Sequence, residues 1–330
     1  MGMSNMSVTV IRRVLFCAVL LLALALLAGA PSFGAGGPAL TPAAESSTPA
    51  EPTITVFAMI GDFGSHDGHA AAVAALVKSW HPAFIVTTGD DYYKQAGGKG
   101  ADRYRRSVAT YYAAWMKGVP KYHGRKVGTA KVNAFFPALG NHDYTDARPS
   151  PKTYLNYFTL PGAGFTSSSG SERYYDFTKG PIHFFILDSN PQEPRGVFAS
   201  SRQAQWLQRA LASSTSSWNV VVDHHPPFSS DTAHGSTVYM QWPFAEWGAD
   251  VVISGHAHVY ERFMHDGIPY IVNGLGGGAR HSFAPTATPE SAIQFDTTWG
   301  AQRVTETSSK LRFEFYDVSG QLIDQYDVWR

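Results

Sequence analysis

Five short apolar runs in this sequence are each followed at once by a cluster of side chains that can bind metal ions. The clusters contain aspartate, asparagine, histidine or tyrosine, and in four of them a glycine precedes the first such residue. Glycine lets the chain turn sharply without a Cβ clash, which leaves the next side chain free to point into a site. The clusters are Gly61-Asp62-Phe63-Gly64, Gly89-Asp90-Asp91-Tyr92-Tyr93, Gly140-Asn141-His142-Asp143, Asp223-His224-His225-Pro226 and Gly255-His256-Ala257-His258.

The chemistry of these side chains suits a pair of metal ions. Carboxylate, imidazole, amide and phenolate groups are ligands for iron, zinc and manganese, and one carboxylate can bridge two cations through its two oxygens. Two cations about 3.5 to 4 Å apart can hold a phosphate oxygen, lower the pKa of a bound water and stabilise the attacking and leaving oxygens. Because ligands of an open α/β sheet bind outside the carboxyl ends of its strands, we expect the clusters to converge. The pattern therefore predicts a dinuclear site for phosphoester hydrolysis.

A single glycine and aspartate after a strand is usually an ordinary turn, so one cluster alone carries little weight. Five clusters in succession are different, because a purely structural role would crowd several carboxylates and histidines without counter-charge. Such crowding costs several kcal/mol for each uncompensated ion. We therefore interpret the five clusters as parts of one functional site.

In order and spelling, the clusters resemble the motifs of the calcineurin-like metallophosphoesterases, and within them those of the purple acid phosphatases. That pattern runs GDxG, GDxxY, GNH(D/E), a histidine after a strand, and GHxH, and all five blocks occur here in this order. The resemblance spans Ile60 to about Arg262, and the small, single-domain purple acid phosphatases look closest. It implies an acid phosphatase-like enzyme in which a metal-bound hydroxide attacks the phosphorus of a phosphate monoester.

Carried over by motif position, the resemblance implies two metal ions that share Asp90 as a bridging ligand. The first ion is Fe(III) in that family, and its colour comes from charge transfer with a tyrosine phenolate. The second is a divalent Fe, Zn or Mn ion. The ligands of the first ion would be Asp62, Tyr93 and His258, and those of the second would be Asn141, His224 and His256.

The adjacent histidines His224 and His225 leave a choice of ligand. The family pattern is His-x-Pro, and His224-His225-Pro226 fits it, so His224 is preferred. His225 is then expected to face outward or to support a ligand from behind.

Three further residues are implied in catalysis by the same resemblance. His142 would contact the phosphate, and Asp143 would orient it through hydrogen bonding. His234, which precedes a glycine in the loop after the His-x-Pro segment, would protonate the leaving group. That loop is about one residue longer than in the small family members, so an ordinary solvated histidine is an equal alternative.

The scaffold predicted for these residues is α/β. From Thr53 onward short β-rich apolar runs alternate with helical patterns, which indicates βαβ units with strands buried on both faces. Together with the resemblance, this predicts a four-layer α/β/β/α sandwich with two mixed sheets and the dimetal site at the carboxyl ends of the strands. The predicted strands are Ile54–Ile60, Phe84–Thr88, Phe135–Leu139, Ile182–Leu187, Val220–Val222 and Val251–Ser254, and the predicted helices are Gly68–Trp80, Asp102–Met116, Ser200–Ala212 and Val238–Trp247.

After His265 the pattern changes to shorter apolar runs, which suit antiparallel strands that close a second sheet. The glycine-rich segment Gly274–Gly278 and the segment His281–Thr298 are predicted loops. The runs are Pro269–Asn273, Gln302–Glu306, Leu311–Tyr316 and Leu322–Val328.

The N-terminal segment has the pattern of a targeting signal. Arg12 and Arg13 are followed by an apolar run to Leu27 and by the small residues Ala28-Gly29-Ala30, which is typical of a cleaved secretory signal over residues 1–30. The run is shorter than the roughly 20 residues of a membrane span, although an uncleaved anchor is an alternative. Residues 31–52 are predicted to be a disordered linker and residues 53–330 the metallophosphoesterase domain. The protein is expected to be secreted or periplasmic.

The composition limits the classes of molecule that this protein is expected to bind. Lys plus Arg and Asp plus Glu both number 26, so no net charge favours nucleic acid or an anionic membrane. Only one cysteine is present, and it lies in the targeting segment, so metal ligands must come from N and O donors. The expected partner is a small phosphate ester. A phosphodiesterase or nucleotide hydrolase on the same site, and a catalytically silent metal-dependent binding protein, are the alternatives.

Overall fold

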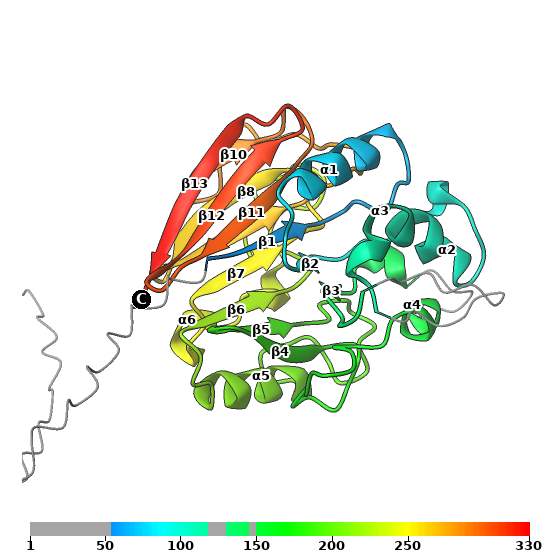
Figure 1. The fold of residues 1–330 in the computed structure, drawn as a ribbon. Coiled ribbons are helices and arrows are strands. Elements are labelled where there is room, and N and C mark those ends of the chain that lie inside the picture. The colour runs from blue at the N-terminus through cyan, green and yellow to red at the C-terminus, as the bar shows by residue number, and fades with distance from the viewer. Residues whose placement is uncertain (1–53, 118–129, 145–149) are drawn as a thin grey trace, which may run out of the picture. The chain divides into compact units, whose positions relative to one another are not determined.

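Two mixed β-sheets pack face to face and carry helices on their outer faces (Figure 1). The computed structural model describes residues 54–117, 130–144 and 150–330. This arrangement confirms the predicted sandwich of two mixed sheets between helices. The predicted targeting segment, residues 1–30, and the predicted linker, residues 31–52, lie outside the described residues. Within the described ranges, no helix combines the length and the apolar character needed to cross a membrane.

The first sheet has six strands in the order β13-β12-β11-β1-β2-β3. β1, β2 and β3 run parallel to one another, whereas β11, β12 and β13 are antiparallel to their neighbours. Its strands are β1 (Thr55–Ile60), β2 (Ile85–Thr87), β3 (Phe135–Phe136), β11 (Gly300–Glu306), β12 (Lys310–Asp317) and β13 (Leu322–Trp329).

The second sheet has seven strands in the order β10-β8-β9-β7-β6-β5-β4. Its centre is parallel, with β5, β6, β7 and β9 side by side, and antiparallel strands flank that centre. Its strands are β4 (Tyr175–Lys179), β5 (Ile182–Ile186), β6 (Trp218–Val222), β7 (Val251–Ser254), β8 (Tyr260–His265), β9 (Ile268–Asn273) and β10 (Ser291–Phe295).

The main core lies between the two sheets and is rich in aromatic side chains. Phe57 of β1 meets Phe184 of β5 edge to face at 5.5 Å between ring centroids, and Phe136 of β3 stacks on Phe177 of β4 at 3.8 Å. Offset and edge-to-face pairs of this kind add to the hydrophobic gain from burial. The packing holds the two sheets together and so fixes the strand ends that carry the polar clusters.

A second core lies on the outer face of the seven-stranded sheet. In β6, Val220 and Val222 belong to the core between the sheets, whereas Val221 belongs to the outer one, because successive strand side chains point to opposite faces. The outer core is covered by α5 (Arg202–Ala212) and α6 (Phe244–Trp247). Both faces of β6 are therefore buried, as its continuous valine run predicts.

Helix α1 (Gly68–Ser79) covers the other sheet and directly follows the first polar cluster. The Asp67 carboxylate caps it by accepting hydrogen bonds from the backbone N–H groups of His69 and Ala70. Its buried side chains, including Val73 and Val77, pack as part of the same continuous apolar cluster as the main core. The cap fixes where the chain turns from the first cluster into the helix.

Two predicted helices are interrupted. The segment Asp102–Met116 folds as α2 (Asp102–Tyr104), a π-helical turn at Arg105–Ala109, α3 (Thr110–Tyr112) and a 3₁₀ turn. Within the π-helical turn, Ser107 Oγ donates to the Asp91 carbonyl oxygen at 2.6 Å, which ties this segment to the second polar cluster. The segment Val238–Trp247 contains a 3₁₀ turn and only the short α6, because Pro243 cannot donate a helical hydrogen bond. A further short helix, α4 (Lys152–Tyr157), was not predicted.

The strand predictions after His265 need two corrections. β11, β12 and β13 extend the sheet that β1 begins instead of closing a second sheet, because β1 pairs with β11 as well as with β2. The predicted loop His281–Thr298 contains β10, which pairs with β8. Strands β4 and β8 were missed as well, because their charged residues hide the apolar pattern: Glu261 and Arg262 lie within β8.

Candidate metal centre

The five polar clusters follow five different strands, and those strands belong to both sheets. Three clusters follow β1, β2 and β3 of the six-stranded sheet, and two follow β6 and β7 of the seven-stranded sheet. The convergence expected at one sheet therefore occurs between two sheets that are packed together. Seven side chains from these clusters contact one another there: Asp62, Asp90, Tyr93, Asn141, His224, His256 and His258.

Asp62, Tyr93 and His258 form one group of donors. The Tyr93 hydroxyl lies 3.2 Å from Asp62 Oδ1 and 2.9 Å from His258 Nε2. His258 Nε2 lies 3.4 Å from Asp62 Oδ1. The other ring nitrogen of His258, Nδ1, faces the carbonyl oxygen of Ala279, which directs Nε2 into the site.

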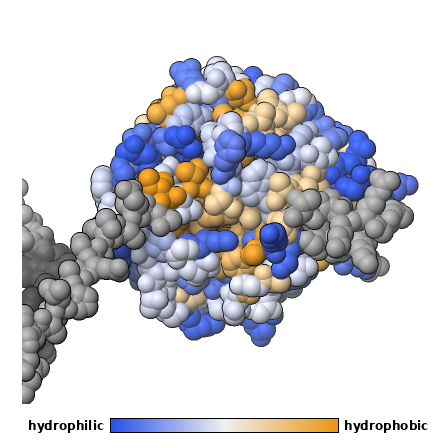
Figure 2. Space-filling view, in the orientation of Figure 1, coloured by the Kyte–Doolittle hydropathy of each residue, from blue (hydrophilic) through white to orange (hydrophobic). Residues whose placement is uncertain are grey.

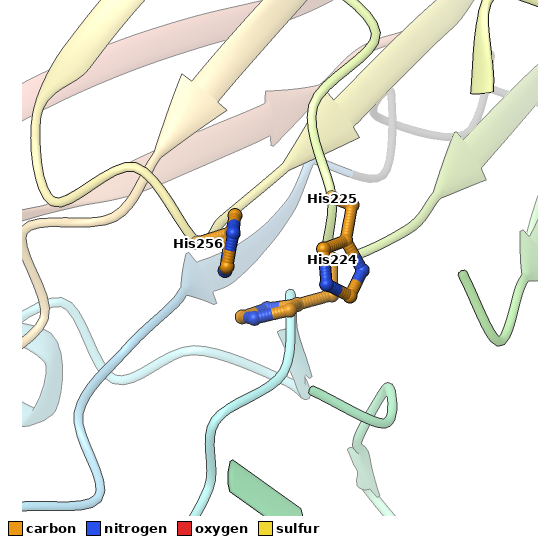
Figure 3. A group of neighbouring side chains, drawn as sticks. All are labelled: His224, His225 and His256. Atoms are coloured by element: carbon orange, nitrogen blue, oxygen red, sulfur yellow. The ribbon is translucent and has the colours of Figure 1, made fainter. Parts of the chain in front are cut away.

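Asn141, His224 and His256 form a second group of donors. Asn141 Oδ1 lies 2.9 Å from His224 Nε2 and 3.0 Å from His256 Nδ1. The rings of His224 and His256 come together from the ends of β6 and β7 (Figure 3). His224 Nδ1 lies 2.8 Å from the carbonyl oxygen of Thr88, so this ring also has a fixed orientation.

Asp90 lies between the two groups. Its Oδ1 is 3.5 Å from His224 Nε2 in the second group. Burial, the charge of Asp62 and the charge of Asp90 itself raise the pKa of Tyr93 in the first group. The backbone N–H of His142 donates to Asp90 Oδ1 at 2.8 Å and holds the carboxylate in place. Asp90 therefore lies near both groups, and a carboxylate has two oxygens with which it could bridge two cations.

Three of the seven residues have left-handed backbone conformations that side chains other than glycine rarely adopt. The φ angles are 58° at Asp62, 53° at Asp90 and 67° at His256. Such a conformation costs about 1–2 kcal/mol per residue, and residues of this kind gather at functional sites. Gly140 is needed because another segment of backbone packs against it. A Cβ atom there would lie 2.2 Å from the backbone nitrogen of Asp90.

Burial controls the protonation of the donors. Burial raises the pKa of Asp90 well above its ordinary value, and the charges of Asp62 and Asp143 raise it further. Burial lowers the pKa of His224 to about 3 and also lowers that of His256, so both imidazoles are neutral at neutral pH. For His258 burial acts in the same direction, but the hydrogen bond and charge of Asp62 outweigh it and its pKa is raised.

The donor set fits metal cations. Asp62 and Asp90 are 0% and 1% exposed, and within the described residues neither forms an ion pair with lysine or arginine. Two buried carboxylates without a cation are costly, because each desolvated charge carries a penalty of several kcal/mol. Neutral imidazoles, an amide oxygen and a phenol complete a set of N and O donors suited to Fe, Zn or Mn.

His142 and Asp143 lie on the same turn, but their side chains point in opposite directions. The His142 side chain is 47% exposed, and its Nε2 lies 4.0 Å from Asp90 Oδ2, at the open side of the donor groups. The Asp143 carboxylate is buried and points the other way, where it accepts hydrogen bonds from the Gly140 backbone N–H at 2.9 Å and from the Tyr104 hydroxyl at 3.0 Å. Asp143 therefore holds the turn through these hydrogen bonds, while its charge acts directly on Asp90.

His234 lies at the edge of the same site. Its ring stacks on His256 at 4.0 Å between centroids, and burial lowers its pKa. His225 does not face outward: it is 7% exposed, its Nδ1 lies 2.8 Å from Ser189 Oγ, and its ring lies 4.4 Å from that of His256. His225 therefore lies against the second donor group, where its ring could offer a ligand atom together with His224 and His256. Its supporting role stays a prediction.

His281 and Asp231 were not singled out from the sequence, yet both border the site. The ring of His281 stacks on His258 at 4.3 Å, and its Nδ1 lies 3.2 Å from Asp231 Oδ2. Both residues lie in loops without a recognisable motif. Only the tertiary fold, which pairs Asp231 with Phe283 in an isolated bridge, brings the two loops together.

Comparison with known proteins gives one family. Residues 55–260 match the family described as calcineurin-like phosphoesterase. Among curated proteins of Arabidopsis thaliana, the chain is 29% identical to purple acid phosphatase 15 over 74% of this chain and 50% of that protein. It is 25% identical to purple acid phosphatase 4 over 82% of this chain and 83% of that protein. It is 26% identical to Fe(3+)-Zn(2+) purple acid phosphatase 12 over 66% of this chain and 46% of that protein.

Solved structures show the same fold. The purple acid phosphatase PPD1 from yellow lupin (Lupinus luteus) seeds matches with a TM-score of 0.63 at 16% identity, over 86% of this chain and 55% of that one. The chain spans about half the length of several of these relatives, purple acid phosphatase 15 and the lupin enzyme among them. The family match, residues 55–260, contains all five polar clusters.

Proposed function

Because this chain belongs to the calcineurin-like phosphoesterase family, we propose that it is a purple acid phosphatase-like enzyme that hydrolyses phosphate monoesters. The observation that carries the proposal is the arrangement of six donors in two groups of three on either side of Asp90. Asp62, Tyr93 and His258 would hold the first ion, with Asp90 as the shared ligand. Asn141, His224 and His256 would hold the second.

The first ion is proposed to be Fe(III) and the second a divalent Fe, Zn or Mn ion. Tyr93 supports the assignment of iron, because a phenolate is a hard anionic ligand that suits Fe(III). Burial and the charges of Asp62 and Asp90 raise the pKa of Tyr93 well above its ordinary value, so a strong cation is required to stabilise the phenolate. The name of one relative, an Fe(3+)-Zn(2+) purple acid phosphatase, agrees with this choice.

In the proposed reaction the protein binds the phosphate and manages its protons. Bound cations would supply Lewis acidity to the phosphate oxygens and to a water molecule. The half-exposed imidazole of His142 would donate a hydrogen bond to a phosphate oxygen and neutralise the charge that develops on it. Asp143 would fix the His142 turn by accepting the backbone N–H of Gly140. His234, which borders the second group, would give the leaving alkoxide its proton.

The test is one sample of purified protein with three measurements. These are the visible spectrum, the metal content, and the hydrolysis of p-nitrophenyl phosphate compared with bis(p-nitrophenyl) phosphate. We expect a violet protein with two metal ions per chain, one of them iron, that prefers the monoester. A preference for the diester would replace the proposal with a phosphodiesterase. A protein loaded with two metal ions but inert on both compounds would refute catalysis and favour a binding protein.

We also propose that the enzyme is exported, on the pattern of residues 1–30. Cleavage after Ala30 would release the domain into a periplasm or the medium. Mass spectrometry of the mature N-terminus, after fractionation of the producing cell, tests this proposal. Full-length protein with Met1 recovered from the cytosol would contradict it.

A further inference from the structure

Three side chains outside the two donor groups form a cluster of their own beside them. Asp231, His234 and His281 each offer one ligand atom, and these three atoms all lie within 4.8 Å of one another. Asp231 and His234 lie on the segment between β6 and the 3₁₀ turn Val238–Met240, and His281 lies between β9 and β10. The bridge between Asp231 and Phe283 holds the two segments together.

Asp231 is a buried carboxylate with unused capacity. It is 4% exposed, and its Oδ2 accepts the backbone N–H of His234 at 2.9 Å. Its other oxygen, Oδ1, is buried and has no hydrogen-bond partner. A buried acceptor left unpaired costs about 1–3 kcal/mol, and binding a cation would remove that cost.

The two histidines also have ring nitrogens available. Neither nitrogen of the His234 ring has a hydrogen-bond partner among the described residues; its ring contacts are the stack on His256 and the tilted ring of His281. The Nδ1 atom of His281 lies 3.2 Å from both Asp231 Oδ2 and the backbone nitrogen of His258, which leaves Nε2 open. Arg280, the nearest cationic side chain along the chain, turns instead to the Trp299 ring, 5.0 Å from its centroid.

We propose that Asp231, His234 and His281 form a third, auxiliary site for a divalent cation of the zinc type. Two imidazoles and one carboxylate are a ligand set that zinc uses in open sites, where a fourth position is left to water or substrate. Tetrahedral ligands at about 2.1 Å from zinc lie roughly 3.4 Å apart. The cluster therefore has to close by at most about 1.4 Å, and His234 can supply that movement because its side chain is exposed.

The position of the cluster gives the site a regulatory consequence. His234 stacks on His256 of the second donor group, and His281 stacks on His258 of the first. A cation held here would lie against both groups at the open edge of the centre. It would also bind the imidazole of His234, which is proposed to protonate the leaving group. High zinc should therefore lower turnover without removing the two metal ions of the centre.

The site is tested by counting metal ions, independently of activity. The purified protein and its variants are dialysed to equilibrium against increasing Zn²⁺, and bound zinc and iron are measured by mass spectrometry. We expect a third equivalent that binds more weakly than the first two in the wild type. D231N, which keeps the shape of the side chain, and H281Q should each lose that equivalent and keep the first two.

The matched control is H265Q. His265 is another partly exposed histidine, next to the carboxylates of Glu290 and Asp266, but among the described residues these three groups do not bring one ligand atom each within 4.8 Å of one another. H265Q should keep all three equivalents. A wild type that saturates at two equivalents, or a third equivalent that survives in D231N and H281Q, would overturn the third site while leaving the dinuclear centre standing. A wild type that binds fewer than two would instead count against the proposed function.

Loss of folding is separated from loss of binding by a second measurement. With Co²⁺ added to protein that already holds two metal ions, a third tetrahedral site gives a new visible absorption band in the wild type. D231N and H281Q should lack that band while keeping the wild-type circular dichroism spectrum. An identical cobalt band in wild type and D231N would refute the assignment of Asp231 as a ligand.

Discussion

Replacing Glu261 with glutamine should destabilise the fold and loosen the loop that carries His234. Glu261 lies in β8 and is fully buried. Its Oε1 accepts Ser230 Oγ at 2.6 Å, Ser291 Oγ at 2.7 Å and Gln294 Nε2 at 2.9 Å. Its Oε2 accepts the backbone N–H of Ser230 at 2.8 Å. One carboxylate therefore joins β8 to β10 and to the start of the loop that leads to His234.

The size of the effect follows from these four donors. In E261Q the amide oxygen can still face three donors, but the amide NH₂ must then face the backbone N–H of Ser230, and two donors meet. A hydrogen bond to a charged acceptor contributes about 1.5–3 kcal/mol, and a buried donor left unpaired costs about 1–3 kcal/mol. The free energy of unfolding should fall by about 2–4 kcal/mol, which lowers Tm by roughly 3 to 7 °C in a domain of this size.

The assay is urea unfolding followed by tryptophan fluorescence, at fixed metal content because bound metal adds its own stability. The control is E290Q, since the Glu290 side chain is 51% exposed and should change stability by no more than about 0.5 kcal/mol. If E261Q is as stable as E290Q, the four hydrogen bonds do not hold the loop and the reasoning is wrong. If it is less stable, its activity on alkyl phosphates should fall as well.

Three further predictions concern the centre and the scaffold. Y93F should keep two metal ions but lose the violet band, and a variant that stays violet would show that another residue is the phenolate. H142A should keep its metal content while kcat/KM falls by about 10²- to 10⁴-fold, and unchanged turnover would remove His142 from catalysis. For Asp176, burial raises the pKa, but hydrogen bonds from His183 and Ser168 outweigh it and leave the pKa below its ordinary value. The ionised carboxylate therefore stabilises the fold above about pH 4, and this stabilisation is lost as the pH falls. In D176N the urea midpoint should change less between pH 3 and 5 than it does in the wild type.

Much of the site could be predicted because its residues follow apolar strands in a fixed order. Asp62, Asp90 and His256 each come directly after a glycine that ends a buried run, and the structure places all three among the contacting donors. What the sequence does not contain is the sheet to which each strand belongs. The pairing of β1 with β11 joins residues such as Thr55 and Glu306, about 250 positions apart, and no local pattern specifies it.

The missed elements have a common cause in side chains whose role is tertiary. Glu261 and Arg262 make β8 look polar, yet one binds four donors in the interior and the other pairs with Asp324 at 2.7 Å. The helix expected at Asp102–Met116 is broken where Ser107 bonds to the backbone of Asp91. The cluster of Asp231 and His281 depends on two loops whose contact only the folded chain creates.

The proposed proton donor and the proposed third cation site compete for one imidazole, and the leaving group distinguishes them. p-Nitrophenolate is a weak base and departs without a proton, whereas an alkyl alkoxide requires one. H234Q should therefore lower kcat/KM for β-glycerophosphate by about 10²-fold or more and change p-nitrophenyl phosphate hydrolysis far less. Excess zinc should act on the wild type in the same selective way and should have no further selective effect on H234Q, since the ligand it needs is gone. Equal inhibition of both substrates by zinc, in both proteins, would mean that zinc acts at the dinuclear centre itself and not at His234.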